Sequence, residues 1–453
     1  MAQISITFAR GARRVTGSNF LVTVVDGART TRILIDCGLT QGEQFCDPTN
    51  GETFTYDPTE IGAVFFTHAH ADHIGLFPKL VKEGFKGRAY ATAPTRDLMP
   101  VMLEDSVSLM RSEATRCGTD VPYVMDDVVH ALKMLTDIPY GETVTVGDAR
   151  VTLLNAGHIL GSALVQIDAG GKRVVFTGDL GRVPSILAPD RDVPEGVDVL
   201  VTESVYGNRT HASVSDSEQE LAAAVQRSYQ EQGTLLIPAF SLERTQIILA
   251  ALDRMMTEGT LPKVPVYMDS PLAAKVTDIY RAYPAFLRPE VRERLERGDD
   301  PFSFPTLRVT VNTESSHLID VAPSPKIVIA GAGMSHGGRI RHHEQKYLPL
   351  KNTTLLLVGY QVAGSLGRRL KDGRKEVAID GVKVKVRARV AAIGGFSAHA
   401  DRDDIVGFVE AVKPRRVFVV LGETEAATFL AQRISGFLGL PTDVPQEGET
   451  YEL

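Results

Sequence analysis

The most informative segment of this chain is Ala63-Val64-Phe65-Phe66-Thr67-His68-Ala69-His70-Ala71-Asp72-His73. Its apolar first half is typical of a buried β-strand, and three histidines and one aspartate then follow within six residues. The next residues, 75–81, predict the start of a helix. A strand, a ligand-rich loop and a helix in this order hold side chains rigidly, and imidazole with carboxylate is a donor set that suits zinc. The stretch therefore predicts a metal site, against the alternative of a chance histidine cluster in a surface loop.

The composition indicates an ordinary globular protein with more than one domain. The chain has 453 residues, of which 43% are hydrophobic and 23% charged, so two or three domains are expected. Its formal net charge of −7 disfavours binding of nucleic acid through a broad basic face. Any site for a polyanion must then be local, built from metals, a few arginines and backbone amides.

The sequence also predicts where the protein works. No apolar run approaches the roughly 18 residues that would span a membrane. The N-terminal residues 1–8 resemble a first strand and not a signal peptide. The only cysteines are Cys37, Cys46 and Cys117, and none of them forms a closely spaced metal-type pair. These features favour a reducing cytoplasm without a disulfide framework.

Hydrophobic patterning divides the chain into parts of different character. The first 200 residues alternate β-rich segments with helices, and a methionine-rich stripe within 95–135 is typical of core packing. From about residue 210 strands alternate with helices, which predicts a parallel sheet whose ligand edge lies at the strand C-termini. After residue 375 the pattern returns to β. The simplest account is a second α/β domain inserted into the first.

Two further candidate ligands stand where predicted strands end. His158 follows a strand at 151–154, and Asp179 follows a strand at 173–176. Flanking glycines allow the tight turns that bring such side chains to a shared centre. Taken alone, His158 is more often a structural histidine, but together with the segment 68–73 it becomes a candidate ligand.

With these residues the chain resembles a hydrolase of the metallo-β-lactamase fold. The resemblance implies that one zinc is held by His68, His70, His158 and Asp179. It implies a second zinc, or manganese as the alternative ion, held by Asp72, His73 and the bridging Asp179. Asp36, at the end of a strand at 32–36, matches the supporting carboxylate below the metals. Such ions can bridge a hydroxide and clamp a phosphoryl oxygen, although the fold also hosts thioesterases and lactonases.

The rest of the chain resembles the β-CASP branch of this superfamily. Val201-Thr202-Glu203-Ser204 is similar to its motif A, and Phe396-Ser397-Ala398-His399 to its motif B, while 331–339 and 358–361 also match. The resemblance implies an αββα sandwich with an inserted α/β domain that contains a parallel sheet. Its expected ranges are 1–207 and 371–453 for the sandwich and 208–370 for the insertion. It further implies a zinc-dependent ribonuclease that acts on single-stranded RNA, in endonuclease or 5′ exonuclease mode, and a homodimer.

The resemblance also assigns roles to individual residues. His399 would protonate the leaving alkoxide as general acid, oriented by Glu203, while Asp72 serves the metal-bound hydroxide that attacks. A purely structural Glu203–His399 pair is the alternative. In the glycine-rich segment the substrate-binding candidates are Ser335, Gly337, Gly338 and Arg339, against the alternative of a tight turn between strand and helix.

The chain departs from the family's pattern at one position. The motif C histidine normally precedes Gly-Glu, but here Leu421 stands before Gly422-Glu423. Leucine cannot coordinate a metal, so we expect the second site to be weakened. Three interpretations remain: an active nuclease with a labile second metal, a weak or inactive RNA-binding scaffold, or an engineered change in an ordinary enzyme. A hydrolase of small esters is disfavoured, because a small substrate needs neither the insertion nor motif B.

Overall fold

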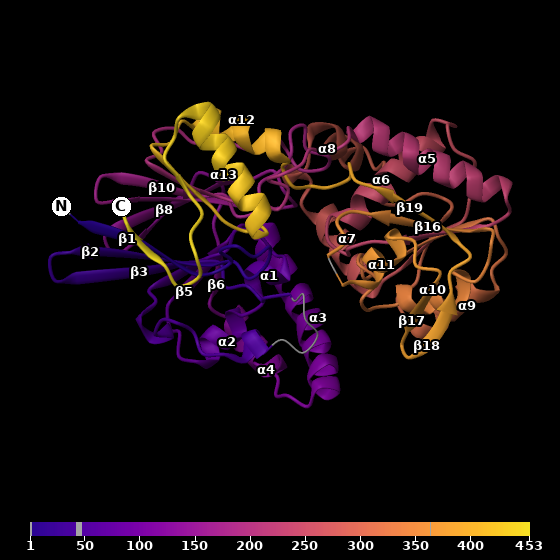
Figure 1. Cartoon of the computed structure of the whole chain (residues 1–453), viewed down its shortest axis with the longest axis horizontal. Helices are drawn as coiled ribbons and strands as arrows, with labels where there is room; N and C mark the ends of the chain where they lie inside the picture. Colours follow the sequence, from indigo (N-terminus) through magenta and orange to yellow (C-terminus); the bar gives the residue numbers. More distant parts are fainter. Residues whose placement is uncertain (1, 42–47, 363) are drawn as a thin grey trace. The chain divides into compact units, whose positions relative to one another are not determined.

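The computed structural model describes residues 2–41, 48–362 and 364–453. The chain divides into two compact units, Met1–Thr210 with His399–Leu453, and His211–Ala398 (Figure 1). The domain ranges expected from the sequence stay predictions beside this division. In the described ranges, no helix has both the length and the apolar character needed to cross a membrane.

The first unit contains two seven-stranded sheets. One runs in the order β22-β1-β2-β3-β4-β5-β6, and the other in the order β21-β20-β11-β10-β9-β8-β7. The strands of the first sheet are β1 (Gln3–Arg10), β2 (Asn19–Asp26), β3 (Arg29–Ile35), β4 (Ala63–Phe65), β5 (Arg88–Ala91), β6 (Leu135–Asp137) and β22 (Thr450–Glu452). Those of the second are β7 (Thr143–Val146), β8 (Ala149–Asn155), β9 (Ala163–Ala169), β10 (Lys172–Phe176), β11 (Val199–Thr202), β20 (Arg416–Val419) and β21 (Thr442–Asp443).

Helices cover the outer faces of both sheets (Figure 1). On the first sheet lie α1 (Ala71–Ile74), α2 (Phe77–Lys82), α3 (Ala93–Cys117) and α4 (Met125–Leu132). On the second lie α12 (Arg402–Val412) and α13 (Thr424–Leu438), and two 3₁₀ turns, η1 (Pro48–Gly51) and η2 (Pro58–Glu60), occupy a connection. A shared core between the sheets includes Phe8, Ile35 and Phe176. The predicted αββα sandwich is confirmed.

The sequence of the central strands reflects this layering. Ile33, Leu34 and Ile35 of β3 are all 0% exposed, although successive side chains of a strand point to opposite faces. Both faces of the sheet are covered, one by the second sheet and one by helices, so a continuous apolar run replaces strict alternation.

The C-terminal segment contributes to both sheets of the first unit. β20 pairs in parallel with β11, with Leu200 opposite Val417. β22 pairs in antiparallel fashion with β1, with Ile6 opposite Tyr451. The two parts of this unit are therefore joined by backbone hydrogen bonds as well as by the core.

The second unit is built on a six-stranded sheet in the order β14-β13-β15-β12-β16-β19, with all neighbours parallel. Its strands are β12 (Thr234–Pro238), β13 (Val266–Asp269), β14 (Leu307–Val309), β15 (Lys326–Ala330), β16 (Thr353–Val358) and β19 (Arg389–Ile393). Its other elements are α5 (Val214–Gln230), α6 (Arg244–Thr257), α7 (Pro271–Ala282), η3 (Pro284–Phe286), α8 (Pro289–Glu296), α9 (Thr313–Val321), α10 (Ile340–Tyr347), α11 (Leu366–Lys371) and the hairpin β17 (Glu376–Ile379)–β18 (Val382–Lys385). The predicted βα alternation with a parallel sheet is confirmed.

Two expectations need correction. Asp72 and His73 do not lie in a loop, because α1 begins directly after His70, whose carbonyl accepts the amides of His73 and Ile74. Cys37 is a buried free thiol, but Cys117 is disulfide-bonded, so a chain without disulfides is not what the structure shows. Cys46 lies outside the described residues.

Candidate metal centre

The candidate ligands meet because several strands end at one edge of the sandwich. Asp36 follows β3, His68 follows β4, and His158 follows β8. Asp179 and Glu203 follow the parallel neighbours β10 and β11. Asp36 and the glycines beside His158 and Asp179 have positive φ angles: 58° at Asp36, 69° at Gly157 and 52° at Gly178. These left-handed turns redirect the chain immediately after each strand.

Four of the predicted ligands form one tight group. Ligand atoms of His68, His70, His158 and Asp179 all lie within 4.8 Å of one another. His68 Nε2 is 2.9 Å from His70 Nδ1, and Asp179 Oδ2 is 3.4 Å from His68 Nε2 and 3.5 Å from His158 Nε2. Both ring nitrogens of His158 are buried without a hydrogen-bond partner in the part of the chain that the structure describes. Buried nitrogens of this kind and a mixed imidazole and carboxylate donor set fit a divalent metal ion.

The electrostatics of the group favour metal-binding protonation states. Burial, the largest influence, lowers the pKa of His68, His70 and His158, and neighbouring imidazoles lower it further. The three rings are therefore neutral near pH 7, which is the form that can bind a metal. Burial alone would raise the pKa of Asp179, but the facing imidazoles of His73 and His399 hold it well below its usual range.

Asp36 supports the site from below. Its carboxylate accepts hydrogen bonds from Ser18 Oγ at 2.9 Å and from the Thr67 amide at 2.8 Å, and it lies 2.7 Å from His73 Nδ1. This leaves His73 Nε2 directed at Asp179 Oδ1, 3.4 Å away, with no hydrogen-bond partner in the described ranges. Ser18 and Thr67 were not identified from the sequence as hydrogen-bond donors to Asp36. The position of Thr67 directly before His68 was the one sequence feature that could have indicated this role.

The second set of predicted ligands is less complete. No group of described ligand atoms within 4.8 Å of one another includes Asp72. Burial raises the pKa of the Asp72 carboxyl, and the charge of Asp179 acts in the same direction. Leu421 is 1% exposed and belongs to the apolar core between the sheets, with a φ of 48°. Its backbone carbonyl accepts the amide of Ser204, so the residue is held by packing and by the backbone.

Glu203 and His399 come together from positions 196 residues apart. His399 Nδ1 lies 3.2 Å from both carboxylate oxygens of Glu203 and 3.9 Å from Asp179 Oδ2. Glu203 is 0% exposed, and its Oε1 also accepts the amide of Leu180 at 2.6 Å. Burial raises the pKa of Glu203, whereas the charge of His399 lowers it. The Nδ1 contact leaves Nε2 as the nitrogen that can exchange a proton with another molecule.

The glycine-rich segment 331–338 lies in the second unit, between β15 and α10. Ser335 is buried with a φ of 58°, and its hydroxyl donates to Glu344 Oε1 at 2.5 Å. Gly338 has a φ of 71°, and a Cβ there would meet the carbonyl of Gly331 at 2.3 Å. Arg339 forms an ion pair of 2.6 Å with the buried Asp269. Gly337 has room around its Cα.

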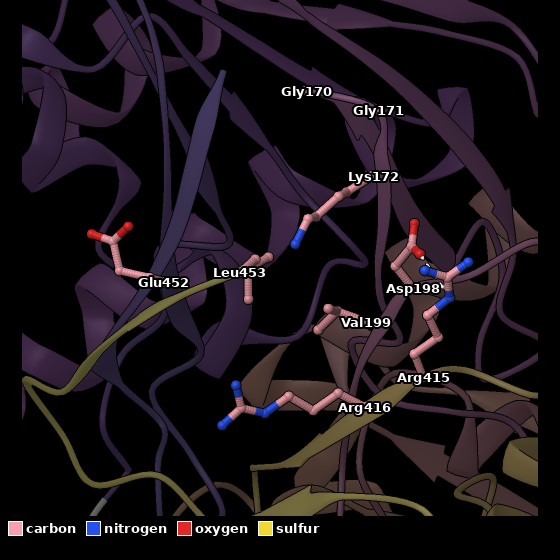
Figure 2. Close-up of a pocket in the computed structure, with 9 residues that line it drawn as sticks. All are labelled: Gly170, Gly171, Lys172, Asp198, Val199, Arg415, Arg416, Glu452 and Leu453. Atoms are coloured by element: carbon pink, nitrogen blue, oxygen red, sulfur yellow. Dashed lines mark ion pairs between the residues drawn. The ribbon is translucent and has the colours of Figure 1, made fainter. Parts of the chain in front are cut away.

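A pocket of about 380 Å³, lined by both basic and acidic side chains, lies at the other end of the second sheet of the first unit (Figure 2). Lys172 begins β10 and Val199 begins β11, whereas Asp179 and Glu203 follow the opposite ends of these two strands. Arg416 begins the neighbouring strand β20. Arg415 pairs with Asp198 at 3.3 Å, and Arg416 pairs with Asp443 at 2.9 Å. The pocket is therefore separate from the metal centre, and its arginines are already neutralised.

Comparison with known proteins agrees with this geometry. Residues 15–226 match the metallo-beta-lactamase superfamily, residues 245–370 the Beta-Casp domain, and residues 383–445 a Zn-dependent metallo-hydrolase RNA specificity domain. A protein of unknown function from Enterococcus faecalis has a similar fold, with a TM-score of 0.57 at 13% identity over 100% of both chains. The fold and the site define a metal-dependent hydrolase of the metallo-β-lactamase superfamily.

Individual relatives narrow this class. The chain is 37% identical to the ribonuclease TTHA0252 of Thermus thermophilus, over 94% of each chain. It is 32% identical to the transcription termination factor FttA of Methanosarcina mazei, over 99% of this chain and 72% of that one. FttA of Methanocaldococcus jannaschii is 30% identical, over 98% and 70%. The chain belongs to the β-CASP family of metallo-β-lactamase-fold proteins.

Proposed function

We propose that this protein is a zinc-dependent ribonuclease that hydrolyses phosphodiester bonds of single-stranded RNA. The observation that carries the proposal is the sharing of Asp179 between two groups: the cluster of His68, His70 and His158, and the pair Glu203–His399. A metal-binding cluster beside a hydrogen-bonded histidine can serve the two tasks of phosphodiester hydrolysis, which are activation of water and protonation of the leaving oxygen. Similarity to a protein named as a ribonuclease, and to an RNA specificity domain, supports RNA as the substrate.

His68, His70, His158 and Asp179 would hold the first ion, with zinc as the proposed metal and manganese as the alternative. A bound ion lowers the pKa of water and neutralises charge on a phosphoryl oxygen. Asp36 orients His73 through the 2.7 Å contact to Nδ1, so the imidazole cannot rotate away from Asp179. Asp72, His73 and Asp179 would hold a second ion, more weakly because Leu421 supplies no donor.

His399 is the proposed general acid. The Glu203 carboxylate accepts a hydrogen bond from His399 Nδ1 and stabilises the protonated imidazole. His399 Nε2 can then deliver a proton to the departing ribose oxygen. Without this proton an alkoxide would have to leave, which is unfavourable near pH 7. Burial of Glu203 keeps water from competing for the Nδ1 contact.

RNA phosphates are proposed to contact the segment that contains Ser335, Gly337, Gly338 and Arg339. Ser335 and Arg339 already bond to Glu344 and Asp269, so their part is to shape the segment. Gly337 and Gly338 are then the residues whose backbone amides would meet a phosphate. A homodimer, a cytoplasmic location and the choice between endonuclease and exonuclease modes stay predictions.

The test of the proposal is cleavage of labelled single-stranded RNA with added zinc or manganese. Wild-type protein should cleave, and His399→Ala should lose about 100-fold or more of the rate, the usual size of a general-acid contribution. A variant with both Asp72→Ala and His73→Ala should also lose activity. RNA cleavage that is unchanged in that double variant would remove the basis for metal-assisted hydrolysis at this site.

A second candidate function rests on Leu421. If the second ion is absent, the protein binds RNA without turnover and acts as a scaffold. Leu421→His restores the imidazole of the family motif at the end of β20, so we expect this variant to retain more metal per chain and to cleave RNA faster than wild type.

Leu421→Gln is the matched control, because it introduces a polar side chain of similar length without an imidazole. Leu421→Gln should increase neither the metal content per chain nor the rate of RNA cleavage. Equal ion counts in wild type and Leu421→His would mean that the leucine does not limit the second site.

A further inference from the structure

A second cluster of metal-type side chains lies in the second unit, outside the site described above. His317 and Asp320 are three residues apart on α9 and therefore share one face of that helix. His342 lies on α10, and one ligand atom from each of the three residues falls within 4.8 Å of the others. None of these residues belongs to the motifs that identify the metal centre. The two histidines are 25 positions apart in the sequence, so no short sequence motif indicates this cluster.

The geometry of the three side chains suits a common ion. His342 Nε2 is 2.9 Å from Asp320 Oδ2, and the rings of His317 and His342 lie 5.6 Å apart at 82° to each other. Bonds of about 2.0 Å to a tetrahedral ion place its ligand atoms roughly 3.3 Å apart, so small rotations of the exposed histidines suffice. The side chain of His342 is 45% exposed, and that of Asp320 only 16%. The site is thus open to an ion from solvent while its carboxylate is held in place.

Lys346 and His342 lie beside different oxygens of the Asp320 carboxylate. Its Oδ1 is buried and has no hydrogen-bond partner among the described residues. Lys346 Nζ lies 3.4 Å from this oxygen and donates instead to the backbone carbonyl of Asp320 at 3.0 Å. The ammonium therefore faces Oδ1, and His342 Nε2 faces Oδ2. An ion on the histidine side does not need to displace the lysine.

The same two helices are already joined on their inner side. Ser316 Oγ of α9 donates to Asp269 Oδ2 at 2.6 Å, and His343 Nε2 of α10 lies 2.8 Å from the same oxygen. Ser316 and His343, which contact Asp269, directly neighbour His317 and His342 in the sequence. Each helix therefore presents one residue to Asp269 and the adjacent residue to the exposed cluster. An ion on the outer side would complete a clamp on the helix pair. It would also fix the start of α10, which directly follows the glycine-rich segment 331–338.

We propose that His317, Asp320 and His342 form a second, non-catalytic site for a divalent transition-metal ion that pins α9 to α10. Two imidazoles and one carboxylate favour zinc over magnesium or calcium, which prefer oxygen ligands. Three protein ligands leave one position for water. The inference goes beyond the proposed function and does not depend on RNA cleavage.

The test compares chelator-stripped wild type with His317→Ala and His342→Ala after equilibration with zinc chloride and removal of free zinc. Metal content by mass spectrometry should be one ion per chain lower in each variant than in wild type. Glu314→Ala, one turn earlier on the same exposed face of α9, is the matched control and should retain the wild-type content.

Amide hydrogen exchange locates the missing ion. Zinc should slow exchange of residues 313–321 and 340–347 in wild type and in Glu314→Ala, but not in His342→Ala, and without zinc the three proteins should exchange alike there. Equal metal content in all four proteins, or exchange in these helices that does not respond to zinc in wild type, would overturn the proposal. Loss of the first metal centre would leave this exchange response intact, so the two sites fail separately.

Discussion

The Asp179 carboxylate lies close to four histidines of the first unit. Its Oδ1 lies 3.4 Å from His73 Nε2, and its Oδ2 lies 3.4 Å from His68, 3.5 Å from His158 and 3.9 Å from His399. A single buried anion surrounded by imidazoles holds the donors in place before any ion binds. The residue would also couple the proposed metal binding to the proposed proton transfer, because its charge acts on both the histidine cluster and His399.

Glu344 gives a prediction at the residue scale in the second unit. Burial raises the pKa of its carboxyl from 4.5 to about 8, and the Ser335 hydroxyl that donates to Oε1 only partly opposes this. The folded protein therefore binds a proton that the unfolded chain releases above pH 4.5, so stability falls as pH rises from about 5 to 8. Each unit of pKa difference corresponds to about 1.4 kcal/mol.

Glu344→Gln removes this titration and keeps an acceptor for Ser335. We expect urea unfolding of the variant to vary less between pH 5 and pH 8 than unfolding of wild type, with the variant relatively more stable at pH 8. Parallel pH profiles of the two proteins would contradict the assignment of the proton to Glu344.

At the scale of elements, α12 begins directly beside His399. Asp401 caps the helix: its Oδ1 accepts the amides of Asp403 at 2.9 Å and Asp404 at 3.0 Å, and Asp404 completes the capping box. The backbone of this segment is tied to the loop that follows β10, because the Ala400 amide donates to the Leu180 carbonyl at 2.6 Å. The cap thus fixes the segment that carries the proposed general acid.

Asp401→Ala should weaken the first turn of α12 by about 1 kcal/mol, the usual loss for an N-cap. Amide exchange at 403–405 should then become about fivefold faster, since 1.4 kcal/mol corresponds to a factor of ten. Asp401→Asn retains an acceptor oxygen and should show a much smaller change. Equal acceleration in both variants would show that the charge, not the cap, stabilises this turn.

At the scale of the whole molecule, metal binding is expected to contribute to folding stability. An ion that binds only the folded state at 100 times its Kd adds about 2.7 kcal/mol. Removal of metal with EDTA should therefore lower the melting temperature of wild type clearly. His158→Ala removes one donor of the first group, and EDTA should lower its melting temperature less.

The combined variant His158→Ala, His342→Ala separates the two sites. It should respond to EDTA less than either single variant, because each histidine belongs to a different unit. An EDTA response of wild-type size in His158→Ala would mean that the first group does not hold the stabilising ion.

The local signals of the sequence predicted a large part of this protein. The strand before His68, the glycine turns beside His158 and Asp179, and the change to βα alternation after residue 210 each depend on residues close together in the chain. Steric and hydrophobic patterns among residues close together in the chain can be recognised without knowledge of the fold. The short helix over Asp72 and His73 was missed because four residues carry too little periodicity to indicate a helix.

The chemical groups of the site, and the strand ends that carry them, can be read from the amino-acid sequence alone. The contacts of Arg339 with Asp269 and of His317 with His342 became visible only in the three-dimensional structure, whereas the pairing of Glu203 with His399 was already implied by the family resemblance. The tertiary structure also placed Leu421 in the apolar core between the sheets. The physical reason is that such contacts are set by sheet order and helix packing, which bring together residues far apart in the chain, whereas sequence patterns report only on near neighbours.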